Sequence, residues 1–382
     1  MELALIVVGL LLAAFVVAEL LARAGLAAWG RYYCWTPSSR SRMPLDSAVF
    51  PHGDALVRFE VNSAGERGSV LPHEWSSTYR ILVAGGSAAE CYFLDQSSSW
   101  PELVASALRQ PDNLSKLGVR DVYVGNVARS LVECRQIAYM LSKLLPRYER
   151  LDCAILMVGA SDLVHWLEKH TPERIEEESI EPTTVFARHP EGPFGWTPSS
   201  LALRRIVSML DKRLRRPIEV RERAGKRLAK NRAMRAAAKE IRTRIADPAP
   251  MLAHYETNLR ELVRLVQGKA KLVLVVRQPW FEKDFTPEER RMLWMFGDGR
   301  AYAEDVQSYY DHRVIWPIFQ EVDAITARVT RELGAQELDL MPHLPRDLET
   351  YYDELHHTPA GCRLVAEHVA RAILSGTRGE RV

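Results

Sequence analysis

The sequence predicts an α/β fold in which five parallel strands form a sheet with helices on both faces. Five short apolar runs have the length of buried strands, and stretches of helical length with one apolar face lie between them. Because parallel strands need long crossover connections, strands that alternate with helices favour a parallel sheet. The composition, with 47% hydrophobic and 26% charged residues, is that of a globular chain with a full core.

The predicted elements leave room for an N-terminal segment and one insertion. The predicted strands cover residues 80–84, 122–124, 153–158, 271–276 and 337–340. The predicted helices cover residues 100–108, 131–145, 252–266, 318–333 and 359–374. We therefore expect one domain over residues 79–376 with an insertion at about 168–250.

The N-terminus has the length and composition of a membrane span. Residues 3–18 contain no polar side chain, and the apolar run resumes after Glu19 and continues to Ala22. Twenty helical residues rise about 30 Å, the thickness of the hydrocarbon core. We predict that residues 1–23 are an uncleaved, single-pass anchor with Glu19 near one interface. A cleaved signal peptide or a buried core helix are the alternatives, but only Glu2 stands where a signal peptide has basic residues.

The segment after the anchor gives the orientation. Residues 24–78 are rich in Pro, Ser and Arg and are predicted to be a juxtamembrane linker and approach segment. Arg23, Arg31, Arg40 and Arg42 follow the apolar run, and no basic side chain precedes it. The positive-inside rule then favours a cytoplasmic domain.

The insertion is strongly charged. Its first part is acidic, and residues 204–244 hold 16 Lys and Arg against four Asp and Glu, a net charge of +12. We expect exposed helix outside the sandwich. Such a segment is either simply solvated or contacts an anionic membrane face or a polyanion. No base-reading motif accompanies the charge, so nucleic acid is not a predicted partner.

The cysteines and histidines predict neither a disulfide framework nor a metal site. Five cysteines are scattered along the chain without a CxxC motif. His356 and His357 are adjacent, and adjacent histidines cannot easily share one ion. No cofactor is predicted.

A candidate nucleophile follows the first predicted strand. Gly85 and Gly86 allow a sharp turn at the strand's carboxyl end, where the Ser87 hydroxyl can face solvent. Such a serine acts as a nucleophile only if a base reaches it, and a plain turn is the alternative.

A candidate base stands just before the last predicted helix. Asp353 and His356 are three residues apart, so a turn can bring them to one side. The carboxylate can then orient the imidazole and stabilise its charged form, while the other ring nitrogen takes the serine proton.

Together these sites resemble the SGNH/GDSL hydrolase superfamily, in its Gly-Gly-Ser branch. The first block ends at Ser87, the last runs from Asp353 to His356 and continues into Thr358, Pro359 and Gly361, and residues 62–68 match an upstream Asn-Ser-x-Gly-x-Arg-Gly motif. Trp100 and Pro101 match the start of the first helix. The resemblance covers residues 60–165 and 270–375 and implies a flavodoxin-like three-layer α/β/α sandwich.

Two blocks depart from the family pattern. The resemblance implies an oxyanion hole made by the Ser87 and Ala128 backbone amides and a third donor at position 161. Ala128 replaces the usual glycine, and Ser161 replaces the usual asparagine. Because a lost oxyanion donor costs about 10²–10³ in rate, we expect low activity unless the geometry has been rebuilt.

The resemblance implies a membrane-anchored serine ester hydrolase, such as an acylesterase or deacetylase, that acts on an acyl ester of a glycan or lipid. The first alternative is an O-acyltransferase acting on an envelope glycan, and the second is a catalytically impaired binding or scaffold protein. Family precedent favours an extracytoplasmic domain, whereas the arginines favour the cytoplasm.

Overall fold

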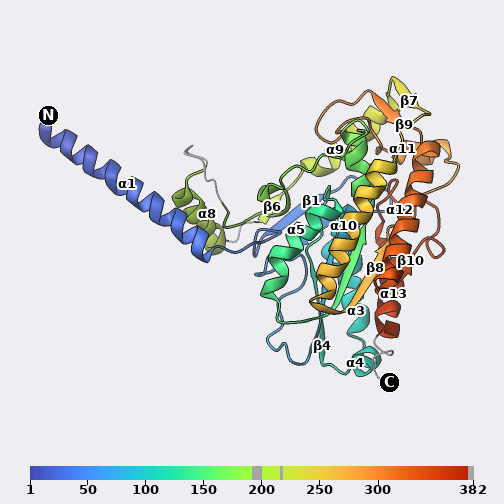
Figure 1. The fold of residues 1–382 in the computed structure, drawn as a ribbon, viewed down its shortest axis with the longest axis horizontal. Helices are drawn as coiled ribbons and strands as arrows, with labels where there is room; N and C mark the ends of the chain where they lie inside the picture. The colour runs from blue at the N-terminus through green and yellow to red at the C-terminus, as the bar shows by residue number, and fades with distance from the viewer. Residues whose placement is uncertain (192–199, 216–217, 377–382) are drawn as a thin grey trace.

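A computed structural model of the protein describes residues 1–191, 200–215 and 218–376. An α/β domain makes up most of it, and a long N-terminal helix projects from the domain (Figure 1). The central sheet has five strands, all parallel, as the sequence predicted. The strands are β3 (Thr78–Gly85), β4 (Asp121–Asn126), β5 (Leu151–Val158), β8 (Ala270–Arg277) and β10 (Gln336–Asp339).

The strand order explains where a site can form. The order is β10-β8-β5-β3-β4, so the first strand along the chain, β3, lies between the second, β4, and the third, β5. This is the flavodoxin-like order, in which the chain reverses its direction of travel across the sheet between β3 and β5. Ligands in such folds bind beyond the carboxyl ends of the strands at this point.

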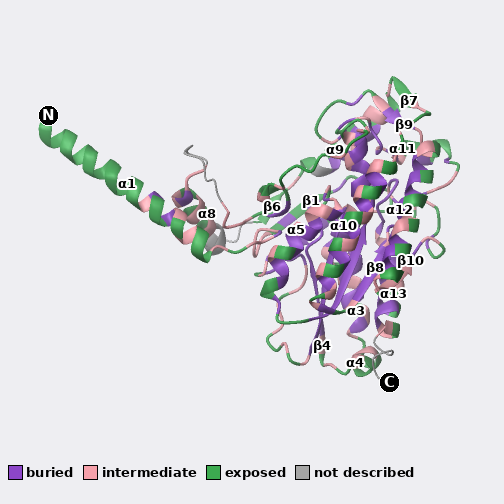
Figure 2. Ribbon diagram, viewed as in Figure 1, coloured by how far each residue is buried: buried purple, intermediate pink, exposed green. Residues whose placement is uncertain are grey.

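Helices cover the sheet in two groups. The first group is α3 (Trp100–Leu108) and α13 (Pro359–Gly376), which pack on each other. The second group is α5 (Cys134–Leu144), α10 (Ala249–Gln267) and α12 (His312–Glu332), in which α10 contacts both neighbours. β3 and β5 are buried along their whole length, which is why the sequence shows each as a continuous apolar run. Buried residues lie mainly in the α/β domain, whereas most of the N-terminal helix is exposed (Figure 2).

Short elements complete the domain. They are α2 (Ser87–Glu90), η1 (Gln96–Ser98), α4 (Pro111–Leu117), η2 (Leu145–Arg147), α6 (Ala160–Glu168), α7 (Pro182–Val185) and α11 (Pro287–Met292).

The N-terminal helix α1 (Glu2–Trp29) is longer than the predicted anchor. Its most apolar 18-residue window has a mean hydropathy of 2.8 and is 6% buried. The helix is therefore long and apolar enough to span a membrane, properties that a signal sequence shares.

Glu19 of this helix is fully buried, and its carboxylate accepts the N–H groups of Ala202 (2.7 Å) and Leu203 (3.0 Å). It also pairs with Arg23 at 2.8 Å. The carboxylate in this apolar helix therefore caps the start of α8 (Ala202–Arg215).

Residues 24–78, predicted to be a linker, are structured. Strands β1 (Arg40–Pro44) and β2 (Leu56–Glu60) form an antiparallel pair, and β6 (Ile218–Val220) from the insertion adds to β1 in parallel. The alternating faces of β1 and β2 bury Met43, Val57 and Phe59 in a small second core that also holds Leu228 of the insertion. The segment before the central sheet thus packs against the insertion between β5 and β8.

The basic insertion is helical, as predicted, but its second helix is not simply solvated. α9 (Arg223–Ala236) packs on the domain, and β7 (Glu240–Arg242) pairs with β9 (Ser308–Tyr310). Arg232 is only 7% exposed and donates to the backbone carbonyls of Val49, Met292 and Tyr352. Arg232 is therefore an exception to the exposed helix that the sequence predicted, because carbonyl groups of three separate segments satisfy its buried guanidinium. The basic residues of α9 from Arg223 to Lys230 are exposed.

The Glu19 cap predicts a specific weakening of α8. Replacing a capping side chain costs about 1 kcal/mol, or about fivefold in an opening equilibrium. We expect Glu19→Ala to raise the rate of tryptic cleavage within α8 several-fold in full-length protein in neutral detergent micelles, measured by mass spectrometry. Glu2→Ala, at the far end of the same helix, is the matched control. Equal cleavage rates in all three proteins would contradict the capping role.

Candidate active site

The Ser87 hydroxyl lies at the carboxyl end of β3, at the reversal point of the sheet. β3 ends at Gly85, and Ser87 begins the short helix α2. A Cβ at Gly85 would lie 2.3 Å from the Met157 carbonyl oxygen of the adjacent strand, so only glycine allows the two strands to approach this closely here. A Cβ at Gly86 would lie 2.8 Å from Ser161 Oγ. The two glycines thus let the chain turn within a crowded strand end.

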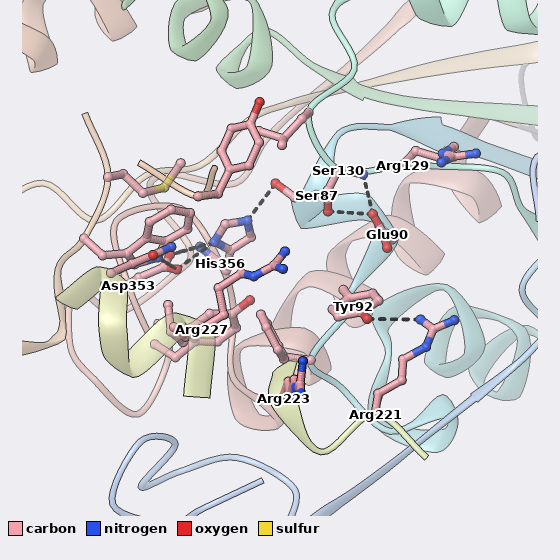
Figure 3. Close-up of a pocket in the computed structure, with 18 of the residues that line it drawn as sticks. Ser87, Glu90, Tyr92, Arg129, Ser130, Arg221, Arg223, Arg227, Asp353 and His356 are labelled. Atoms are coloured by element: carbon pink, nitrogen blue, oxygen red, sulfur yellow. Dashed lines mark hydrogen bonds and ion pairs between the residues drawn. The ribbon is translucent and has the colours of Figure 1, made fainter. Parts of the chain in front are cut away.

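Asp353 and His356 lie in one turn before α13. Asp353 Oδ1 accepts the N–H groups of Leu355 (3.0 Å) and His356 (2.9 Å), which closes the turn. His356 Nδ1 lies 2.8 Å from both carboxylate oxygens of Asp353. His356 Nε2 lies 2.7 Å from Ser87 Oγ (Figure 3). The structure therefore brings together the three residues that the sequence singled out, at hydrogen-bond distances.

Burial and charge set the protonation of this pair. Asp353 is 0% exposed and His356 is 8% exposed. Burial alone would raise the pKa of Asp353, but the charge of His356 and hydrogen bonds from His356, Leu355 and Trp294 lower it below its ordinary value. Burial alone would lower the pKa of His356, but the Asp353 charge and hydrogen bond raise it above its ordinary value. This arrangement can accept a proton at Nε2 and hold it as an ion pair.

Side chains that the sequence did not reveal brace this turn. The Trp294 indole N–H donates to Asp353 Oδ2 at 2.8 Å. Glu354 is fully buried and accepts the N–H groups of Trp294 (3.1 Å) and Met295 (3.0 Å). The Tyr352 ring stacks on His356 with centroids 5.4 Å apart. A glutamate next to the predicted Asp353 was the available sequence signal for this brace, and Trp294 gave none.

Arg67 of the upstream motif fixes the segment that follows Ser87. It is 1% exposed, and its guanidinium donates to the carbonyls of Glu90, Cys91 (2.6 Å) and Leu94 (2.7 Å). The Trp100 indole donates to the Ala88 carbonyl at 3.0 Å. Both motifs therefore hold the backbone around the serine rather than facing the open pocket.

The three predicted oxyanion donors differ in their availability. The Ser87 N–H and the Ser161 hydroxyl form no hydrogen bond with the rest of the described chain. The Ala128 N–H donates to Asn126 Oδ1 at 2.9 Å, so an oxyanion would have to displace this contact.

Ser87 and Ser161 border a small cavity of 10 Å³ that Gln278, just after β8, also lines. This cavity is close to the size of one water-sized group. A polar residue at the end of a predicted strand was the signal for Gln278.

A larger cavity of 660 Å³ opens in front of Ser87 and His356. Its lining comes from four parts of the chain: the segment before β1, the loops after β3 and β4, the insertion, and the loops around Trp294 and Tyr352. Aromatic side chains make up much of the wall, namely Trp35, Tyr92, Phe93, Trp294, Tyr302 and Tyr352. The insertion and the predicted linker thus both contribute to the site.

Comparisons with known proteins find structural likeness alone. No family model matches the chain, and no curated protein matches it in sequence. The acetylxylan esterase Axe2 from Geobacillus stearothermophilus is 12% identical, with a TM-score of 0.41, and the match covers 77% of this chain and 94% of that one. LAE5, an alpha/beta hydrolase enzyme from the metagenome of Lake Arreo, is 13% identical with a TM-score of 0.40 and the same coverage. At these values the likeness does not inform on the reaction of this chain.

The raised pKa of His356 predicts the pH dependence of Ser87 reactivity. Proton transfer to His356 requires the neutral ring, so the rate should fall as the pH drops through a His356 pKa that lies above its ordinary value. Asp353→Asn removes the charge that raises it, so the acid limb should move to lower pH while the maximal rate falls about 10³–10⁴-fold. The rate of fluorophosphonate labelling against pH measures both effects.

Glu349→Gln is the matched control for this measurement. Glu349 is an exposed carboxylate on the same loop. The Glu349→Gln substitution should leave the dependence of the labelling rate on pH unchanged. An Asp353→Asn profile with an unmoved acid limb would show that the carboxylate does not set the His356 pKa.

The small cavity predicts the effect of restoring the asparagine at position 161. An asparagine side chain is longer than that of Ser161 and would present a fixed N–H inside the cavity. We expect Ser161→Asn to raise turnover of a short-chain acyl ester about tenfold or more, because one oxyanion donor contributes about 3 kcal/mol. Ser161→Ala should lower turnover if the hydroxyl already donates. Unchanged turnover in both variants would remove position 161 from the oxyanion site.

Proposed function

We propose that this chain is a membrane-anchored, SGNH-type serine ester hydrolase with Ser87 as nucleophile, His356 as base and Asp353 as its orienting carboxylate. The observation that carries the proposal is the chain of hydrogen bonds from Asp353 through His356 to Ser87, with a distance of 2.7 Å at the serine. A catalytic serine needs a base within this distance, and a serine in a plain turn does not. The same contact favours a catalyst over an impaired binding protein.

The proposed reaction uses each of these groups in turn. Ser87 Oγ attacks the acyl carbonyl carbon as His356 Nε2 takes the hydroxyl proton. The Ser87 N–H and the Ser161 hydroxyl, with Ala128 if its amide is freed, stabilise the oxyanion. As the alcohol leaves, it takes the proton from His356. Water then attacks the acyl-serine with the same base, which releases the acid and restores Ser87.

The aromatic cavity favours a sugar as the alcohol part. A cavity of 660 Å³ exceeds what a short acyl group requires. Flat aromatic side chains offer the apolar faces on which sugar rings stack, while their polar edges bond to hydroxyls. The same lining supports the second candidate function, an O-acyltransferase in which a glycan hydroxyl replaces water in the last step. Helix α1 would keep either activity at a membrane.

If Ser87 is the nucleophile, replacing it should abolish covalent labelling of the protein by a fluorophosphonate probe. Full-length protein in neutral detergent should hydrolyse a chromogenic short-chain ester and react with a fluorophosphonate probe. Ser87→Ala should abolish both, whereas Ser106→Ala, at an exposed serine on α3, should leave both intact. Turnover that survives Ser87→Ala would refute the assignment. Release of the acyl group to an added glycan rather than to water would identify the transferase.

A further inference from the structure

The basic insertion forms one wall of the large cavity. Arg221 precedes α9, and Arg223 and Arg227 lie in its first two turns, and all three line the cavity together with Ser87 and His356 (Figure 3). Positions 223 and 227 are four residues apart, so they share one face of the helix. The charge that the sequence suggested for a membrane surface therefore reaches the proposed active site.

Arginines of this insertion differ in what they bind. Arg232 and Arg235, further along α9, donate to backbone carbonyls and are structural. Arg221 donates to Tyr92 and to Glu219, both at 3.0 Å. Arg223 and Arg227 form no hydrogen bond or ion pair with the described residues. Two solvent-exposed cations of one helix face thus line the cavity without a partner among the described residues.

Such a pair is unfavourable without a ligand. Like charges at positions i and i+4 of a helix repel each other and destabilise it. Both side chains are exposed, so solvent keeps this repulsion small. An anion between the two guanidinium groups would remove it.

Most acidic side chains of the cavity have partners other than Arg223 and Arg227. Glu219 pairs with Arg221, and Asp353 with His356. Glu90 accepts hydrogen bonds from Ser130, and burial raises the pKa of its carboxyl. Glu222, exposed at the start of α9, is the remaining carboxylate in the lining.

Arg129 adds a further positive charge on another side of the cavity. Its Nη1 donates to the backbone carbonyls of Cys34 (2.9 Å) and Val185 (3.1 Å), and its charge acts on the nearby Glu90 carboxylate. Its guanidinium lies over the Trp35 ring, 4.9 Å from the centroid. The lining thus holds four arginines and four carboxylates, and among the described residues Arg223 and Arg227 are the two arginines of the lining that form no hydrogen bond or ion pair.

We infer that the alcohol part of the ester substrate carries an oxyanion group, a carboxylate or a phosphate, which Arg223 and Arg227 bind. This inference rests on the proposed ester hydrolysis and names the substrate class of that site. The planar guanidinium offers paired N–H donors that match both groups. Because these two arginines line a cavity that also holds Ser87, a small charged substrate fits them better than a flat membrane surface does.

The test compares matched esters with full-length protein in neutral detergent. The substrates are a methyl glucoside, its uronate and its 6-phosphate, each with one acetyl group at the same hydroxyl. We expect kcat/KM to be about tenfold to a hundredfold higher for at least one charged ester than for the neutral one. The charged ester that is preferred identifies carboxylate or phosphate as the group.

Substitutions then assign the preference to the two arginines. Arg223→Gln with Arg227→Gln should reduce the charged-to-neutral ratio of kcat/KM to near one, and raised salt should reduce it in the wild type. Lys226→Gln removes the same charge from the same helix at an exposed position outside the cavity lining and should keep the ratio.

The outcomes separate this inference from the proposed function. Equal kcat/KM for all three esters, or a ratio that survives the double substitution, would overturn the inference while ester hydrolysis stands. If none of these esters is turned over, calorimetry with glucose 6-phosphate, glucuronate and glucose decides the anion site instead, and the chromogenic ester decides hydrolysis. Binding of a charged sugar that the double variant loses would support the site, and equal binding of all three sugars would overturn it.

Discussion

One hydrogen bond, between His356 Nε2 and Ser87 Oγ, joins two turns that are 269 residues apart in sequence. A contact of this length tolerates little error, so both turns must be held in place from several directions. The parallel sheet fixes the first turn, because Gly85 abuts the Met157 carbonyl and Arg67 holds the carbonyls that follow the serine. Trp294 and the Glu354 carboxylate fix the second turn. Much of the polar network around the site therefore serves one geometry rather than contacting a substrate.

The central sheet could be predicted from the sequence because its strands are buried on both faces. A fully buried strand such as β5 contains an apolar run that no turn residue interrupts. Even the half-buried β10 was predicted, because helices with clear apolar faces flank it. Periodicity carries no information on which strands are neighbours, and the order of the sheet followed only from the family resemblance. β1 and β2 were missed because they are five residues long and lie among turn residues.

The site was predictable to the extent that its residues follow or precede regular elements. Ser87 stands at the end of a strand and Asp353 and His356 stand before a helix, and both positions can be read from the pattern. Trp294 and Arg232 stand in segments without a motif, and their roles arise from tertiary contacts alone. For the oxyanion site, the sequence showed which positions differ from the family pattern. It did not show that the Ala128 N–H donates a hydrogen bond to the Asn126 side chain.

The net charge of the insertion indicated that it is basic, but it did not indicate what the individual arginines do. The same helix, α9, contains one arginine that is 7% exposed and bound to carbonyls, and two exposed arginines that line the cavity and have no partner in the part of the chain that the structure describes. Composition cannot distinguish these cases, because what differs is the solvation of each guanidinium and not its charge. The insertion also reaches the other end of the molecule, where Glu19 of α1 caps α8. One segment therefore both contacts the candidate membrane helix and forms part of the wall of the proposed active site.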